Sequence, residues 1–526
     1  MSLININHLT FYYEGSSKLI FDNVSLQIDT DWKLGLVARN GRGKTTLLKL
    51  LQTQGKNFAG GEKEKYEYRG SIVSSEEFDY FPFSVRDPKR NTVDIAEEMY
   101  PGYEFWKLCR ELNLLQVNPD VLYRPFFTLS SGEQTKVMLA VLFSMEEKFL
   151  LIDEPANHLD MNARNSVKEY LKGKKGFILV SHDRDFLDEC VNHILAINKT
   201  NIEVYQGNFS SWWEQRKKQE TYELSENERL KKDINRLKES AGKARQWADH
   251  AEATKIGKKS IKNGESVGGR EYIGEKSRRM QMRRKNLERR REKEIEQKSQ
   301  LLKNMEIAED LKLFCLRHHK DRIVSLRDVQ IYFGDKKLKS LSFDILNGDR
   351  IALQGQNGCG KSSFIKVILQ EAGKSVEYRK IGETEKGKGN SPMVYSGRIQ
   401  IAPGLIISYV PQDSSFLMGD LIQYGEMKGL DIPIFLSLLR KLDFEREQFE
   451  KNMRDYSAGQ KKKVLLAASL CERAHLYVWD EPLNYIDVFS RMQLEELLNT
   501  FRPTLLMVEH DKGFVEKICD KMIDCE

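Results

Sequence analysis

Gly355-Gln356-Asn357-Gly358-Cys359-Gly360-Lys361-Ser362 is the stretch that decides the fold of the second half of this 526-residue chain. It follows a strand-like run at 350–354 and precedes an apolar, helix-like run at 364–369. A glycine-rich loop between a strand and a helix lets backbone N–H groups surround phosphates, while the lysine reaches the outer phosphates. The pattern therefore predicts an α/β domain that binds a nucleotide.

The same pattern recurs near the start of the chain as Ala38-Arg39-Asn40-Gly41-Arg42-Gly43-Lys44-Thr45-Thr46. Three more motifs recur in the same order: Ser-Ser-Gly at 130–132 and Ser-Ala-Gly at 457–459, Asp-Glu-Pro at 153–155 and 480–482, and His-Asp at 182–183 and 510–511. The copies are 317 residues apart at the lysines and 327 or 328 at the later motifs. Because the motifs keep their order and the offset between the copies changes so little, the sequence predicts two α/β P-loop domains in tandem, 1–208 and 320–526.

The two loops supply the candidate ATP-binding residues. Ala38 replaces the first glycine of the first loop, and we expect binding to survive because alanine fits wherever φ is negative. Cys359 is interpreted as a tolerated variable position rather than a redox switch, and the hydroxyls of Thr45 and Ser362 are candidate Mg²⁺ ligands. The ATP-binding candidates are Asn40, Gly41, Gly43, Lys44, Thr45, Thr46, Asn357, Gly358, Gly360, Lys361, Ser362 and Ser363.

Acidic pairs end two apolar, strand-like runs. Asp153 and Asp480 are candidate Mg²⁺ ligands, and a glutamate directly after each can orient and polarise an attacking water. An Asp-Glu pair can also be no more than a solvated strand end. Here, however, both glutamates follow the motif serine of their copy by 24 residues. We therefore predict that Glu154 and Glu481 are catalytic.

Composition narrows the class of protein. Hydrophobic residues make up 40% of the chain and charged residues 31%, which excludes collagen-like, mucin-like and wholly disordered chains. No apolar run approaches the ~18–20 residues of a membrane-spanning helix, and the N-terminus lacks a signal-peptide pattern. Seven scattered cysteines without C-x-x-C spacing argue against a zinc finger or an iron–sulfur cluster. We expect a cytoplasmic protein without a membrane partner.

The excess positive charge lies between the two domains. Residues 211–300 have a net charge of +10, whereas the whole chain has +6. Helical spacing before 254, five glycines from 255 to 274 and a near-heptad pattern afterwards predict a long antiparallel α-helical, coiled-coil-like linker over 209–319, with its tip around 255–275. Such a basic helix suits RNA phosphates, or it is a solvated coiled-coil surface. The candidate RNA contacts are Tyr272, Ile273, Lys276, Arg278, Arg279, Arg283 and Arg284.

The motif set resembles that of the ATP-binding-cassette ATPases across both domains. In that family a signature serine and glycine bind the γ-phosphate held by the opposite domain, so the resemblance pairs Lys44 with Ser457, and Lys361 with Ser130. ATP then joins two halves of one chain, which implies a monomer. The resemblance also implies signature glycines, switch histidines, an Mg²⁺-contacting glutamine and adenine-stacking aromatics: Gly132, Gly459, His182, His510, Gln412, Tyr13 and Phe333.

Some of these positions leave alternatives open. Tyr13 and Phe333 can be core aromatics instead, and either aromatic neighbour at 11 or 12 can take the place of Tyr13. The first domain has Phe83 where the second has Gln412. Because a phenyl ring cannot coordinate a metal ion, slower or altered hydrolysis is expected at the first site.

The arrangement of two such domains around a helical linker resembles the ABC-F translation proteins. The run from Asp480 to Asp487, Asp-Glu-Pro-Leu-Asn-Tyr-Ile-Asp, resembles the group that protects against lincosamides, streptogramin A and pleuromutilins. The resemblance implies binding to the tRNA exit site of the 70S ribosome and contacts with 23S rRNA and P-site tRNA. It also implies drug release near the peptidyl-transferase centre by the tip that carries Tyr272 and Ile273, which can alternatively be an exposed loop.

Three other functions remain open. The nearest is a housekeeping ABC-F translation factor without drug protection. Another is the ATPase subunit of a transporter, in which the basic linker has no clear role. The third is a DNA-associated ATPase, in which a coiled coil separates the P-loop from the signature serine of one domain. In this chain the P-loop lysine and the signature serine are 86 residues apart in the first domain and 96 in the second, which is too short for a long coiled coil between them.

Overall fold

The computed structural model describes residues 2–13, 19–53, 68–145, 148–157, 159–198, 202–219, 315–333, 336–373, 379–380, 393–444 and 448–525, with part of 221–239. The linker tip and the basic residues that follow it lie outside this range. The expectations for Tyr272, Ile273, Lys276, Arg278, Arg279, Arg283 and Arg284 therefore stay predictions, as do the predicted domain limits. The chain divides into one compact unit of Met1–Trp212 with Asp310–Glu526, and a second of Trp213–Glu309.

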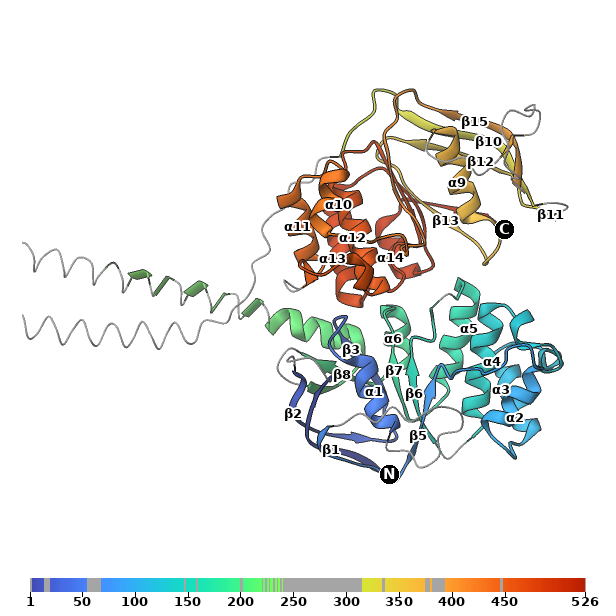
Figure 1. Cartoon of the computed structure of the whole chain (residues 1–526), viewed down its shortest axis with the longest axis vertical. Coiled ribbons are helices and arrows are strands. Elements are labelled where there is room, and N and C mark those ends of the chain that lie inside the picture. Colours follow the sequence, from blue (N-terminus) through green and yellow to red (C-terminus); the bar gives the residue numbers. More distant parts are fainter. Residues whose placement is uncertain are drawn as a thin grey trace, which may run out of the picture. The chain divides into compact units, whose positions relative to one another are not determined.

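The first domain has two sheets with helix α1 packed between them (Figure 1). The smaller, antiparallel sheet has the order β2-β1-β4, and the larger, mainly parallel sheet has the order β5-β6-β7-β3-β8-β9. The strands are β1 (Leu3–Tyr12), β2 (Leu19–Asp29), β3 (Lys33–Ala38), β4 (Arg69–Val73), β5 (Glu77–Phe81), β6 (Lys148–Asp153), β7 (Phe177–Val180), β8 (His193–Ile197) and β9 (Ile202–Gln206).

Burial explains why these residues form parallel strands. All four residues of β7 are buried, as are the four central residues of β6. Continuous apolar runs are typical of parallel strands that are covered on both faces. The covering helices and short 3-10 helices are α1 (Lys44–Gln52), α2 (Thr92–Met99), α3 (Phe105–Leu114), η1 (Pro119–Tyr123), η2 (Phe126–Thr128), α4 (Ser131–Phe143), α5 (Met161–Lys172) and α6 (Arg184–Cys190).

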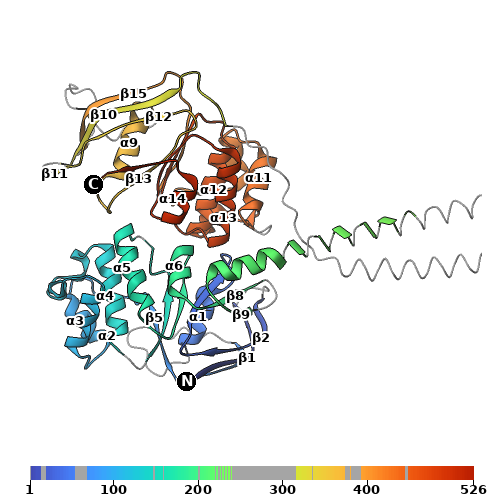
Figure 2. The same cartoon turned by 180° about the vertical axis from the view of Figure 1, so that it is seen from behind.

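The second domain repeats this plan (Figure 2). Its parallel sheet has the order β16-β17-β18-β13-β19, and its other sheet has β11-β10-β15-β14 with β12 also paired to β10. Helix α9 shares one hydrophobic cluster with both sheets. The strands are β10 (Arg322–Phe333), β11 (Lys336–Lys337), β12 (Leu341–Leu346), β13 (Arg350–Gln354), β14 (Arg379–Lys380), β15 (Met393–Ile401), β16 (Ile407–Val410), β17 (Leu476–Asp480), β18 (Leu505–Val508) and β19 (Lys521–Asp524).

A separate hydrophobic cluster joins the other helices of the second domain, without α9, to the opposite face of its parallel sheet. Trp479 on β17 is fully buried in it, and its Nε1 donates a hydrogen bond of 2.9 Å to Oγ of Ser469. The helices are α9 (Lys361–Glu371), α10 (Leu421–Met427), α11 (Ile432–Lys441), η4 (Met453–Asp455), α12 (Ala458–Cys471), α13 (Val488–Phe501) and α14 (Lys512–Ile518). Within the described residues, no helix combines the length and apolar character needed to cross a membrane.

Both sheets place the predicted motifs at one edge. The first glycine-rich loop follows β3 and the first Asp-Glu pair follows β6, with β7 between these two strands. The second domain has the same arrangement in β13, β18 and β17. Because parallel strands end at the same edge of a sheet, each domain gathers its loop lysine and its acidic pair there.

Candidate nucleotide-binding sites

The two glycine-rich loops have the predicted strand–loop–helix geometry. Gly43 and Gly360 cap α1 and α9 with φ of 90° and 101°. A Cβ atom would lie 2.6 Å from Ile20 at Gly43 and 2.1 Å from Leu338 at Gly360. Only glycine therefore fits these two positions, because a side chain would meet both backbone strain and a steric clash.

Both loop lysines are buried at the carboxyl end of their strand. Nζ of Lys44 donates to the carbonyl oxygen of Ala38 at 2.9 Å, and Nζ of Lys361 donates to the carbonyl oxygens of Gly355 and Gln356 at 2.7 and 2.8 Å. Burial lowers the pKa of Lys44, while nearby Asp487 opposes that shift. Gly355 has φ of 139°, whereas Ala38 ends the extended strand β3 and is not among the residues with positive φ. The backbone at Ala38 therefore avoids the conformation that alanine disfavours, and nucleotide binding by this loop stays a prediction.

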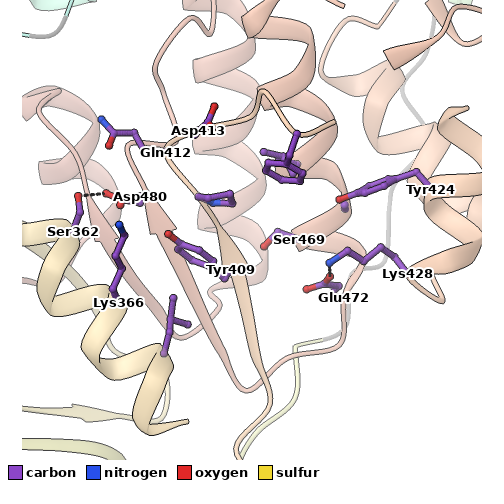
Figure 3. A pocket seen from close by; sticks show the side chains of 15 residues that line it. Ser362, Lys366, Tyr409, Gln412, Asp413, Tyr424, Lys428, Ser469, Glu472 and Asp480 are labelled. Carbon is purple, nitrogen blue, oxygen red and sulfur yellow. Dashed lines mark hydrogen bonds and ion pairs between the residues drawn. The ribbon is translucent and has the colours of Figure 1, made fainter. Parts of the chain in front are cut away.

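Each domain pairs a loop hydroxyl with the aspartate at the end of the neighbouring strand. Oγ1 of Thr45 donates to Asp153 at 2.9 Å, and Oγ of Ser362 donates to Asp480 at the same distance. Figure 3 shows the second pair at one end of a cavity of about 560 Å³, with Gln412 beside it. Burial raises the pKa of Asp480 to about 6. One hydroxyl and one carboxylate form a donor set that fits Mg²⁺ bound together with phosphate oxygens.

The two predicted catalytic glutamates share a rare backbone conformation. Glu154 and Glu481 have φ of 53° and 46°, in the left-handed region that side chains other than glycine, asparagine and aspartate seldom occupy. Strain of this kind is common at functional sites. An asparagine three residues later donates to each glutamate: Asn157 to Glu154, and Asn484 to Glu481 at 2.6 Å. The turn thus aims both carboxylates and holds them by the same side-chain contact.

The switch histidines differ between the domains. Nε2 of His182 lies 2.5 Å from Glu154, whereas Nε2 of His510 lies 3.9 Å from Glu481. Burial opposes ionisation of Glu154, but the His182 and Asn157 contacts hold its pKa at about 2. Burial lowers the pKa of both histidines, that of His510 to about 4, with a contribution from Lys361. We infer that both imidazoles are neutral near pH 7 and that Glu154 is ionised.

Other contacts of the two acidic pairs are also unequal. Gln412 donates from Nε2 to Glu481 at 2.8 Å, and the first domain has Phe83 at the corresponding position. There, Tyr80 on β5 instead donates its hydroxyl hydrogen to Asp153 at 2.8 Å. Nε2 of His510 is buried without a hydrogen-bond partner in the described part of the chain, which suits a group that contacts a phosphate oxygen.

The signature motifs begin long helices. Ser130 and Ser457 cap α4 and α12 through capping boxes with the third helical residue, and Gly132 and Gly459 lie in the first turn. The N-terminus of such a helix attracts anions. Ser131, in the signature of the first domain, lines a cavity of about 570 Å³ together with the glycine-rich loop of the second domain. The loop residues that line it are Asn357, Gly358, Gly360, Lys361, Ser362 and Ser363, with Gln412, Glu481 and His510 beside them.

The other signature lies beside the first loop. A Cβ atom at Gly459 would lie 3.1 Å from Nδ2 of Asn40, and this amide donates to the carbonyl oxygen of Tyr485 at 3.1 Å. The first domain also contacts the second through Arg39 with Asp443 and Arg184 with Glu495. We call the Lys44 loop with the Ser457 signature site 1, and the Lys361 loop with the Ser130 signature site 2.

Tyr13 lies close to the first loop. Its hydroxyl is 2.7 Å from Oγ1 of Thr46, and the residue is 42% exposed beside the loop, where the resemblance expects an aromatic that stacks on adenine. Phe11 is buried in the core and therefore unsuited to stack on a ligand, whereas Tyr12 is half exposed. Phe333 ends β10, but its side chain lies outside the described residues.

Sequence reasoning missed Asn157, Asn484 and Tyr80. Both asparagines stand three residues after the glutamate of their copy, so the internal repeat carried a signal for them. Tyr80 reaches Asp153 because β5 pairs in parallel with β6, with Tyr80 opposite Leu151. No local pattern announces this contact.

Comparisons with known proteins agree with this geometry. The family model described as "ABC transporter" matches residues 21–157 and 338–484, more than half of the chain. The ribosome protection protein VmlR of Bacillus subtilis is 28% identical over 96% of this chain and 84% of its own length. The ATP-binding protein Uup of Buchnera aphidicola is 27% identical over 99% of this chain and 80% of its own length. The ABC transporter F family member 5 of Arabidopsis thaliana is 24% identical over 99% and 75%.

Solved structures show the same tandem fold. The archaeal ribosome recycling factor aABCE1, in complex with the stalk protein aP1, has a TM-score of 0.57 with 18% identity over 98% of this chain and 87% of that chain. The RNase-L inhibitor has a TM-score of 0.55 with 19% identity over the same shares. Two complete P-loop ATPase domains, matched by the family model and by relatives along almost the whole length, place the chain in the ATP-binding-cassette family, in its ABC-F group of ATPases.

Proposed function

We propose that this ATPase binds the bacterial ribosome and uses its interdomain linker to release antibiotics from the peptidyl-transferase centre. The observation that carries the proposal is the pairing of two P-loop ATPase domains with similarity to a ribosome protection protein over 96% of the chain. Two composite sites let ATP control one conformational change. The ribosome supplies RNA phosphates that the basic linker between the domains can bind.

At each site, ATP is held by groups from both domains. Lys44 and Lys361 contact the outer phosphates, while the helix N-termini at Ser457 and Ser130 face the γ-phosphate from the opposite domain. Thr45 with Asp153, and Ser362 with Asp480, would hold Mg²⁺, which would neutralise charge on the phosphate oxygens. Because the signature and the loop belong to different domains, bound ATP favours the closed arrangement.

Hydrolysis reverses this closure. Glu154 and Glu481 accept a hydrogen bond from the attacking water and orient it in line with the γ-phosphate. Asn157 and Asn484 hold these carboxylates, and His182 and His510 contact the γ-phosphate as neutral imidazoles. Once the γ-phosphate has left, the signature helices lose their ligand and the domains separate.

The closed form fits the tRNA exit site of the ribosome. There the linker reaches P-site tRNA and 23S rRNA, with Lys276, Arg278, Arg279, Arg283 and Arg284 on phosphates. The tip residues Tyr272 and Ile273 perturb the drug-binding pocket. Reopening after hydrolysis releases the protein.

The double variant Glu154→Gln with Glu481→Gln tests this cycle. It should bind ATP like the unaltered chain, hydrolyse it at least about 100-fold more slowly, and sediment with 70S ribosomes in ATP. A matched control is Glu169→Gln, a surface glutamate of α5 whose side chain is 66% exposed. If the double variant sediments with ribosomes no better than the unaltered chain in ATP, the release step is wrong.

A housekeeping translation factor without drug protection is the second candidate. Similarity to Uup at 27% over 99% of the chain, nearly equal to the similarity to VmlR, favours it. Expression in a drug-sensitive bacterium separates the two functions. Raised resistance to lincomycin or tiamulin supports drug protection, whereas unchanged susceptibility with ribosome binding intact supports the housekeeping role.

A further inference from the structure

Arg164 of the first domain borders the nucleotide cavity of the second. It lies in the first turn of α5, and together with Ser131 it lines the cavity of about 570 Å³ at site 2. Lys361, Glu481 and His510 line the same cavity from the second domain. The Arg164 guanidinium therefore lines a cavity that is built mainly by the second domain, and Ser131 of the signature is the other first-domain residue in its lining.

The Arg164 side chain has one good hydrogen bond, from Nε, and a longer ion pair from a terminal nitrogen. Its Nε donates to the carbonyl oxygen of Leu159 at 3.1 Å, and one terminal nitrogen lies 3.6 Å from Asp183. The Arg164 side chain is 11% exposed. At 3.6 Å, Arg164 and Asp183 form an ion pair but not a good hydrogen bond. The terminal nitrogens of Arg164 can therefore turn toward a more strongly charged group such as a phosphate.

The equivalent arginine of the second domain is engaged on all sides. Arg491 stands 327 residues later, at the offset of the neighbouring motifs. Its Nε donates to Ile486, one terminal nitrogen donates to Leu483, and the other donates to Asp511 at 2.9 Å. Three good bonds make Arg491 part of the buried framework, so the two arginines have different roles despite their equivalent positions.

We propose that Arg164 acts across the domain interface as a catalytic arginine of site 2, binding the γ-phosphate of ATP held by Lys361. In the reaction, a water oxygen forms a bond to the γ-phosphorus while the bond from that phosphorus to the β,γ-bridging oxygen breaks. The electron pair of that bond stays on ADP, and the water proton is released through Glu481. The planar fork of Arg164 binds two of the equatorial oxygens, whose charge it stabilises during the transfer.

This role gives site 2 a property that site 1 lacks. Site 2 has Gln412 on Glu481 and a reorientable Arg164, whereas site 1 has Phe83 and an Arg491 bound within its own domain. The same features that complete the catalytic set at site 2 are absent or fixed at site 1. Site 2 is therefore the faster of the two.

The test uses the full chain with one site silenced at a time, and it rests on the roles proposed for Glu154 and Glu481. In the Glu154→Gln background, where site 2 acts alone, Arg164→Gln should lower kcat about 100-fold and change KM less than about threefold. Arg164→Lys should lower kcat by a smaller factor, because lysine keeps the positive charge but not the planar guanidinium. In the Glu481→Gln background, Arg164→Gln should leave kcat within about twofold.

Arg184→Gln is the matched control, because Arg184 also joins the two domains, through Glu495, but does not line the cavity. The proposal is overturned if Arg164→Gln lowers kcat equally in both backgrounds, or if Arg184→Gln reproduces its selective loss. If neither glutamate variant slows hydrolysis, the roles of the glutamates fail instead. Arg164→Gln in the otherwise unaltered chain then decides, since unchanged kcat there contradicts the arginine role.

Discussion

Nε2 of His182 lies 2.5 Å from Oε1 of Glu154, whereas the corresponding atoms of His510 and Glu481 are 3.9 Å apart. In the second domain Gln412 donates a hydrogen bond of 2.8 Å to the other carboxylate oxygen, Oε2 of Glu481. Beyond the asparagine contact that they share, the two copies therefore hold their predicted catalytic carboxylates by different partners. The proposed hydrolytic rates of the two sites should differ accordingly.

Single glutamate variants should expose this difference. We expect Glu481→Gln to lower steady-state phosphate release more than Glu154→Gln does, because site 2 has the additional amide of Gln412. Removal of a general base costs about 10²–10⁴-fold at its own site, so each single variant reports the rate of the other site. Equal losses of half the activity would show that the sites turn over alike.

The missing glutamine of site 1 can be restored. Phe83→Gln in the Glu481→Gln background, where only site 1 acts, should raise kcat several-fold because an amide can then reach Glu154 and the metal ion. Phe83→Leu controls for the loss of the aromatic ring. Phosphate release at varied Mg²⁺ checks the effect, and a gain that leucine reproduces would exclude a role for the amide.

Much of each site was predictable because its parts are local in sequence. The glycines, lysines and Asp-Glu pairs stand in short motifs, and the repetition of these motifs in the same order, 317 and 327 residues apart, marks them as candidates without knowledge of the fold. Their partners were harder to predict. Tyr80 reaches Asp153 through the pairing of β5 with β6, and Arg164 reaches site 2 only through the contact of two domains. Such relationships depend on long-range packing, which short patterns do not encode.

Side-chain geometry was also beyond the sequence. The positive φ of Glu154 and Glu481 occurs in the turn that ends each strand. Glutamate has no intrinsic preference for the left-handed region, so the sequence does not predict this conformation. The motifs made His182 and His510 equivalent, yet their distances to the glutamates differ by more than 1 Å. The linker residues are untested in this respect, since they lie outside the described residues.

A buried carboxylate should make the stability of the first domain pH-dependent. Glu111 on α3 has no exposed surface, and its side chain accepts hydrogen bonds from Tyr170 at 2.6 Å and from Lys174. Burial opposes ionisation of Glu111, but these bonds win and hold its pKa below the usual value. A depressed carboxyl pKa stabilises the fold above the unfolded-state value and ceases to do so as pH falls through the folded-state value.

Glu111→Gln should therefore destabilise the first domain at pH 7.5, by about 1–3 kcal/mol for a buried charge-assisted network. Thermal unfolding at pH 7.5 and near pH 4 measures this, and the gap to the unaltered chain should narrow at the lower pH. Glu169→Gln is the exposed control. A gap that stays constant with pH would show that Glu111 acts through packing and not through its charge.

The linker tip should separate ATPase activity from drug protection. Shortening the chain between Gly257 and Gly274 should abolish resistance to lincomycin and tiamulin while leaving ATP hydrolysis within about twofold, because all the ATP-site residues lie in the two domains. Susceptibility of the host and phosphate release by the purified protein check the two effects. Retained resistance would remove the tip from the mechanism.

The charge of the linker should set the salt dependence of ribosome binding. Each phosphate contact that is lost makes the slope of log affinity against log salt shallower by about 0.7–0.9. Replacing four linker arginines by glutamine should therefore flatten the slope by about three and weaken binding most at low salt. The four are Arg278, Arg279, Arg283 and Arg284.

Four exposed basic residues of the two domains provide the comparison, since their removal changes the net charge by the same amount. They are Arg86, Lys172, Arg322 and Lys512, with side chains 64%, 52%, 56% and 62% exposed. Sedimentation with 70S ribosomes and with membranes between low and high salt measures both sets. If the control set flattens the slope as much as the linker set does, net charge alone governs association. If the linker set leaves the slope unchanged, those arginines contact no phosphate.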